Sequence, residues 1–153
     1  MTLFIVAHPF VFARSRIDVA AHARDYVTLV ALQEDRSGKY STWLIAHRWS
    51  TVDPRIAGAS SGSSQLHIVA DDRELSFNAA DPAPSVLNRA DLLFAPHSAG
   101  AQSAAYAIDV PTLRYLASAQ RLSLRYVDDA LTPAYTVWDD ARAPLLALLD
   151  GIR

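Results

Sequence analysis

The clearest pattern of hydrophobic and polar positions lies between Tyr26 and Trp49, where two runs rich in β-branched and aromatic residues flank a polar segment at 34–39. Gly38 lies in that segment, and its backbone tolerates the positive φ that a tight turn needs. In the second run, a period of two separates one face, Trp43, Ile45, His47 and Trp49, from the other, Thr42, Leu44, Ala46 and Arg48. The pattern predicts a long β-hairpin around which the rest of the chain is organised.

Other short apolar or alternating runs predict further strands. The chain opens on an apolar run, in which Pro9 indicates an edge position or a bulge. We expect a hairpin from the runs 65–70 and 75–78, and a third hairpin from the runs 91–96 and 104–109. The remaining predicted strands lie at 2–13, 17–23, 121–127 and 134–138.

Helical spacing is confined to the last third of the chain. Pro111 suits the first turn of a helix, and apolar residues at helical spacing predict a short helix at 111–118. A second helix is predicted near 140–150, with Asp139 as its N-cap and Gly151 just past its end. Pro144 indicates that this helix begins nearer Arg142 or is kinked. The chain is therefore predicted to be mainly β (α+β), a β-sandwich or partial barrel of about 8–10 strands with two helices.

Length and composition favour one folded domain. A chain of 153 residues with 51% hydrophobic and 20% charged residues can bury its own core. We expect a single domain at 1–153, with a flexible loop at 57–64, where small polar residues and glycines gather. The net charge of −2 gives no general attraction to nucleic acid, so no nucleic-acid partner is expected. The absence of cysteine excludes disulfides and thiolate metal sites.

The N-terminal run bears on localisation. No positive residue precedes it and His8 and Pro9 interrupt it, so we interpret it as a strand instead of a signal peptide. It is shorter than the roughly 20 residues of a membrane-spanning helix, and no transmembrane segment is expected. The expected location is cytoplasmic for the chain as written, and periplasmic if a leader was removed before Met1. Lys39 is the single lysine in an arginine- and alanine-rich chain, which we interpret as the codon bias of a GC-rich bacterial genome.

The C-terminal third carries a resemblance to known proteins. It rests on Tyr106–Pro111, Leu113, Leu116, Arg121–Arg125, Tyr135–Val137 and Leu145–Leu149. This succession resembles the end of a group of uncharacterised bacterial β-rich domains, in which a strand, a short helix, a strand pair and a closing helix follow one another. Many members of that group are lipoproteins or envelope proteins, and the resemblance implies such a setting. The chain differs from them in having no lipobox cysteine, and the resemblance supplies no catalytic residue.

Three local motifs of common enzyme classes are absent. The sequence contains no GxGxxG, GxxxxGK[ST] or HExxH. Three histidines, His47, His67 and His97, lie in or beside predicted strands and could converge as a three-nitrogen metal site. The alternative is that they are ordinary sheet and loop histidines, and no cofactor is expected in that case.

The aromatic face of the long hairpin is the candidate binding surface. Trp43 and Trp49 flank His47 and could form a platform for a ligand. The alternative is that both tryptophans are core residues with His47 hydrogen-bonded beside them. We expect a non-catalytic accessory or interaction module that binds a protein or a small ligand. The alternatives are a small metal-dependent hydrolase using the histidines, or a structural subunit that oligomerises through an edge strand.

Overall fold

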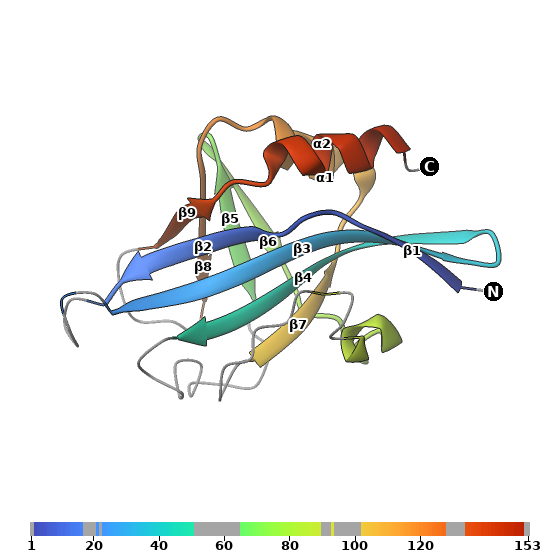
Figure 1. Ribbon diagram of the computed structural model, residues 1–153, viewed down its shortest axis with the longest axis horizontal. Helices are drawn as coiled ribbons and strands as arrows, with labels where there is room; N and C mark the ends of the chain where they lie inside the picture. Colours follow the sequence, from blue (N-terminus) through green and yellow to red (C-terminus); the bar gives the residue numbers. More distant parts are fainter. Residues whose placement is uncertain are drawn as a thin grey trace.

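The computed structural model describes residues 2–16, 21, 23–50, 65–89, 93, 102–127 and 134–151. Within these residues, nine strands form one sheet in which every pairing is antiparallel (Figure 1). The elements are β1 (Thr2–Val6), β2 (Phe10–Ser15), β3 (Arg24–Arg36), β4 (Lys39–Ser50), β5 (Leu66–Ala70), β6 (Arg73–Phe77), η1 (Ser85–Asn88), β7 (Gln102–Ala107), α1 (Val110–Ser118), β8 (Leu122–Tyr126), β9 (Tyr135–Asp139) and α2 (Arg142–Gly151). The predicted mainly β fold with two helices is confirmed.

Strands β3 and β4 form the predicted long hairpin. Their register pairs Asp25 with Ser50 at one end and Arg36 with Lys39 at the other. The chain reverses through Ser37 and Gly38, whose φ values are 54° and 90°. The amide of Gly38 donates to the side chain of Asp35 at 2.8 Å, which stabilises the turn.

The sheet curls into a nearly closed barrel. Its strand order is β6-β5-β8-β9-β2-β3-β4-β7, and β1 pairs with the far half of β3. Pro9 lies in the interruption between β1 and β2, where the register against β3 shifts by one residue. The edges of the sheet meet just after β6, where Ala79 bridges Tyr106 and the Ala80 amide donates to the Ala105 carbonyl at 2.8 Å.

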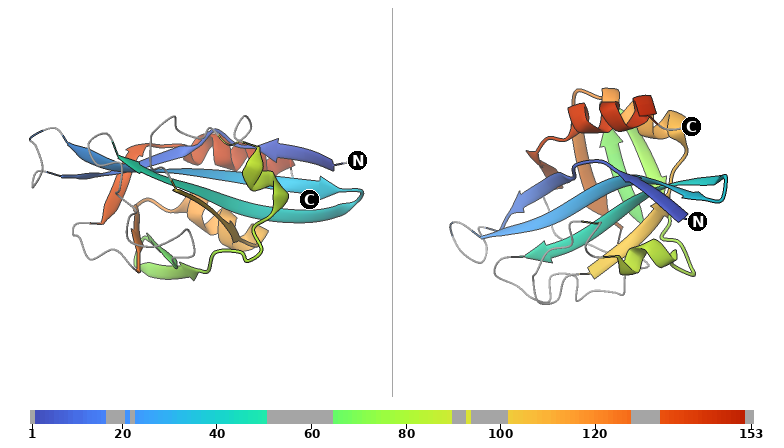
Figure 2. Two further views of the ribbon diagram at one scale, coloured as in Figure 1. Left: turned by 90° about the horizontal axis from the view of Figure 1, so that it is seen from below. Right: turned by 45° about the vertical axis from the view of Figure 1, so that its right-hand side comes forward.

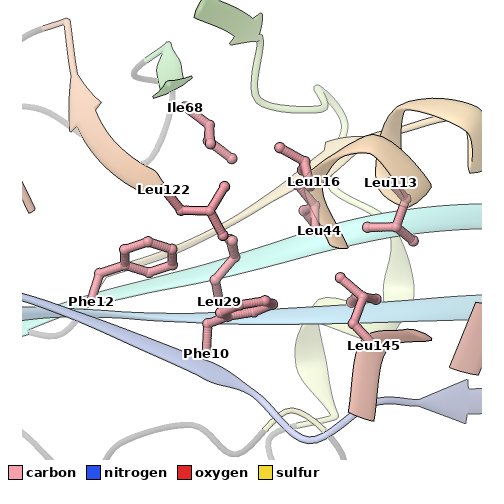
Figure 3. Close-up of a pocket in the computed structure, with 10 residues that line it drawn as sticks. Phe10, Phe12, Leu29, Leu44, Ile68, Leu113, Leu116, Leu122 and Leu145 are labelled. Carbon is pink, nitrogen blue, oxygen red and sulfur yellow. The ribbon is translucent and has the colours of Figure 1, made fainter. Parts of the chain in front are cut away.

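The two helices cover one end of the barrel, as Figures 1 and 2 show. Helix α1 is capped by Asp109, whose side chain accepts the Thr112 amide at 2.7 Å. Hydrogen bonding from the Thr112 side chain, and then from its amide, lowers the pKa of Asp109. Leucines of both helices pack against Phe10 and Leu29 inside the barrel (Figure 3). The cavity left between them is entirely apolar and only about 10 Å³ in volume, so side chains fill this end of the barrel.

A second, smaller core lies on the outer face of the sheet. Val30 and Ile45 on β3 and β4 pack there against Val86 of η1 and against Leu93. The middle of β4 is therefore buried on both faces, which explains why the burial of its residues does not alternate.

Some sequence predictions need correction. Strand β7 pairs with β4, whereas we expected it to pair with a strand at 91–96. Of those residues the structure describes only Leu93, which lies in a turn. Gly151 is the last residue of α2, not the residue after it. The 3₁₀ helix η1 was not predicted. The predicted strand at 17–23 lies mostly, and the predicted loop at 57–64 entirely, outside the described residues.

Within the described ranges, no helix is long and apolar enough to span a membrane.

Candidate functional site

The predicted binding face of Trp43, His47 and Trp49 lies on the outer wall of the barrel. His47 is only 1% exposed, and both tryptophans are half-buried. The Trp49 ring stacks on Tyr26 with ring centroids 4.4 Å apart, and its Nε1 donates to Thr28 Oγ1 at 3.0 Å. Trp43 packs against the outer core. His47 is therefore covered and both tryptophans are packed on the wall, and ligand binding at this face stays a prediction.

His47 is fixed by both of its ring nitrogens. Nδ1 lies 2.6 Å from Ser103 Oγ, and Nε2 lies 3.0 Å from the carbonyl oxygen of Leu93. A carbonyl can only accept, so Nε2 carries the proton and the neutral ring accepts the Ser103 hydroxyl proton at Nδ1. Burial lowers the pKa of His47, an effect that the hydrogen bond to Leu93 partly opposes.

The predicted three-histidine metal site is not assembled by the residues that the structure describes. His67 on β5 bonds Gln65 Oε1 through Nε2 at 2.9 Å and Glu74 through Nδ1. Its hydrogen bond lowers the pKa of Glu74, and Arg125 adds to the effect. Strands β4 and β5 are not neighbours in the sheet, and His97 lies outside the described residues. Among the described side chains, no group of three His, Asp or Glu residues could hold a metal ion.

Inside the barrel, polar side chains gather at the end opposite the helices. Consecutive strands in the sheet order each contribute one residue whose position continues the inward alternation of its strand. Around the barrel these residues are Tyr126 on β8, Tyr135 on β9, Arg14 on β2, Asp25 on β3, Arg48 on β4 and Gln102 on β7. We call this set the polar ring.

An ion-pair network forms one side of the polar ring. Asp25 is fully buried, and one of its oxygens accepts from Arg14 Nε and a second nitrogen of Arg14, both at 2.9 Å. Arg16 at the rim adds bonds of 3.0 and 3.3 Å to the same carboxylate. The Arg14 guanidinium also lies over the Tyr135 ring, 4.5 Å from its centroid.

Arg48 forms the other side of the polar ring. Its guanidinium lies over the Tyr126 ring, 3.9 Å from the centroid, although β4 and β8 are not adjacent in the sheet. The contact therefore crosses the interior of the barrel. Gln102 lies beside it, and its buried Oε1 has no hydrogen-bond partner among the described residues. A cavity of about 10 Å³, room for one water, is lined by these groups and by neighbouring residues of β4 and β7.

Sequence reasoning missed the polar ring. It placed Arg48 on the face opposite the tryptophans, which is correct, but a charged residue normally indicates a face of the strand that is exposed to solvent. The available signal was repetition, because Arg14, Asp25 and Arg48 each stand two positions from a buried apolar residue on the same face of their strand.

A surface hollow of about 460 Å³ lies where β8 and β9 diverge. Its central cation, Arg142, is already engaged: it donates to both oxygens of Asp140 and to the carbonyls of Ala119 and Gln120 at 2.7–3.0 Å. Hydrogen bonding to Asp140 raises the pKa of Arg142, and the same bonds lower the pKa of Asp140. Arg142 thus ties the beginning of α2 to the residues after α1, and we interpret the hollow as structural.

In the described structure, two arrangements of side chains could support binding or catalysis: the polar ring, and the pair formed by His47 and Ser103. The resemblance to envelope-type domains stays a prediction. No protein-family model, curated protein or solved structure matches this chain.

Proposed function

We propose that the protein is a binding module for a small organic anion carrying a carboxylate, held at the polar ring. The observation that carries this proposal is the burial of charge inside the barrel: Arg14 and Arg48 are each 5% exposed and Asp25 is not exposed at all. Removing charged groups from water is costly, and two hydrophobic residues are often at least as stabilising as a buried ion pair. Function is a reason for a fold to keep such groups.

The charges of the ring favour an anion. Among the described residues inside this end of the barrel and at its rim are the guanidinium groups of Arg14, Arg16 and Arg48 and the carboxylate of Asp25. Guanidinium groups bind carboxylates with paired, parallel hydrogen bonds. The flanking tyrosine rings supply flat apolar contact, so a planar carboxylate suits the site better than a tetrahedral phosphate.

The location of the ring fits a binding site at the mouth of a barrel. In the described part of the barrel, α1 and α2 close the opposite end and side chains fill it, so we place the entry of the ligand at this end. The small cavity beside Arg48 requires its guanidinium to swing off Tyr126 to admit a carboxylate, a motion that a long side chain on rotatable bonds allows. This non-catalytic function agrees with the sequence prediction of a small-ligand module, at a different site.

The test is thermal unfolding in sodium benzoate, acetate or phosphate, against sodium chloride of equal ionic strength. A ligand at 100 times its Kd adds about 2.7 kcal/mol, which raises Tm by several degrees in a chain of this size. We expect benzoate to stabilise the protein most, and Arg48→Met to abolish the rise relative to its own chloride control. Arg121→Met removes an exposed arginine and should keep the full rise.

Stabilisation by phosphate alone would overturn the carboxylate assignment. Equal Tm values in all four salts, or a benzoate effect that survives in Arg48→Met, would refute binding at the polar ring.

A further inference from the structure

We propose that Ser103 is a nucleophilic serine activated by His47, able to react with small acyl esters. This inference is independent of the anion site, because both side chains lie on the outer face of the barrel wall. It rests on geometry: the hydroxyl of Ser103, an exposed residue, lies 2.6 Å from the Nδ1 atom of a buried imidazole whose other nitrogen is held by a carbonyl.

The sheet register creates the pair. His47 on β4 stands directly opposite Ser103 on β7. Two residues away, the carbonyl of Ala105 faces Ala80, so the backbone of Ala105 points away from β4. By the alternation of antiparallel strands, His47 and Ser103 form a non-hydrogen-bonded pair, in which opposing side chains are closest. The contact is therefore built into the pairing of two strands and needs no loop to hold it.

His47 is suited to act as a general base. Its neutral ring presents the lone pair of Nδ1 to the hydroxyl, and the Leu93 carbonyl fixes the tautomer as a carboxylate does in catalytic triads. No charged side chain of the described residues contributes to its pKa: its neighbours on the flanking strands are Thr28 and Ser103. Because burial lowers that pKa, His47 stays neutral and able to take a proton into mildly acidic solution.

The edge of β7 offers a donor for the negative charge that develops on an ester. The alternation that turns the Ala105 backbone away from β4 does the same for Ser103. The Ser103 amide thus points to the edge of the strand, next to its own side chain. An amide of the nucleophile itself is one of the two donors in serine protease oxyanion holes. The neighbouring outward residue on β7, Ala105, is buried in the outer core, so we expect only a small acyl group to fit beside the hydroxyl.

The reaction conserves atoms and protons. Ser103 Oγ forms a bond to the ester carbonyl carbon while its proton passes to His47 Nδ1, and the alcohol leaves with the electrons of the broken C–O bond and that proton. Water then attacks the acyl group, His47 takes the proton of the water, and the carboxylic acid leaves as the proton returns to Ser103 Oγ.

The experiment uses a fluorophosphonate probe, with which Ser103 Oγ would form a bond to phosphorus while fluoride leaves. We expect intact-mass analysis to show one adduct per chain and peptide mapping to place it on Ser103. Ser103→Ala should lose the adduct entirely, and His47→Gln should slow labelling by about 100-fold, the scale of general-base catalysis. Ser41→Ala is the matched control, since Ser41 is an exposed serine on the same face of β4, and it should label at the wild-type rate.

A second measurement does not depend on how well the His47 variant folds. The labelling rate of the wild-type protein should follow the lowered pKa of His47, so that the midpoint of its pH profile lies below 6.5, the ordinary pKa of an imidazole. The same variants should show the same order in the hydrolysis of p-nitrophenyl acetate. No adduct, an adduct on another residue, or equal labelling of Ser103→Ala would overturn the proposal.

Discussion

Replacing Asp25 by Asn should destabilise the protein more than any single change at its surface. Asp25→Asn keeps the size of the side chain but removes the charge that faces Arg14 and Arg16, whose side chains are 3% and 12% exposed. Breaking a buried ion pair by removing one partner costs about 3–5 kcal/mol, because the remaining charge stays buried. The Tyr135 ring beside Arg14 and the amide oxygen of the new Asn offset part of this, so we expect a loss of about 3 kcal/mol.

Urea unfolding measures this loss. At a slope of about 2 kcal/mol/M, the midpoint should fall by about 1.5 M with the slope unchanged, and Tm should fall by about 6–12 °C. Asp72→Asn is the control: it removes the acid of an ion pair whose side chains are 75% and 95% exposed, and the midpoint should not move. The double variant Arg14→Met, Asp25→Leu should recover most of the lost stability.

A midpoint for Asp25→Asn within experimental error of the wild type would refute the description of Asp25 as the counter-ion of the polar ring. A double variant less stable than Asp25→Asn would show that packing, not charge, controls this end of the barrel.

Two further predictions concern His47 and the helix-covered core. Below its ordinary pKa of 6.5 the unfolded chain protonates His47, while the folded chain resists because burial lowers that pKa; the contribution of His47 to stability is therefore full above pH 6.5 and lost as pH falls. Urea midpoints measured from about pH 7 to 5 should fall less steeply for His47→Gln, and equal slopes would contradict this. Leu113→Ala, at a fully buried site, should cost about 3 kcal/mol of unfolding free energy, whereas Leu146→Ala, at a site 40% exposed, should cost less than about 1 kcal/mol. Comparable losses would mean that α1 does not seal the barrel.

Local periodicity in the sequence sufficed to predict most strands and helices, but not which strands pair with each other. The alternation through Trp43 and Trp49 predicted β4 and its faces, and proline and leucine spacing predicted α1 within one residue. The partner of β7 was predicted wrongly, because a short strand carries no record of which distant strand it pairs with. The same limit hid Ser103 from view, since only the register of β4 against β7 brings it to His47.

The candidate site was harder to predict than the fold for a physical reason. A charged residue at an alternating position normally marks the solvent face, so Arg48 drew no attention as an interior residue. The tryptophans drew attention because of their size, yet Trp43 packs against the outer core and Trp49 stacks on Tyr26. A β-strand that is buried on both faces lacks the alternation of apolar and polar residues from which its inward face could be predicted.

The position of β9 in the sheet determines when the barrel can be completed during synthesis and folding. It lies between β8 and β2, so that Val137 pairs with the N-terminal Phe12 and Tyr135 pairs with Leu124. While a ribosome is still making the chain, β2 and β8 each lack this neighbour and expose a row of amides and carbonyls. Strands β2 and β9 must then pair across more than a hundred residues of sequence, a slow step by the rule that links contact separation to folding rate. The nascent chain is therefore most prone to incorrect strand pairing just before β9 is synthesised. The last strand to be made is the one that joins β8 to β2 and completes the sheet.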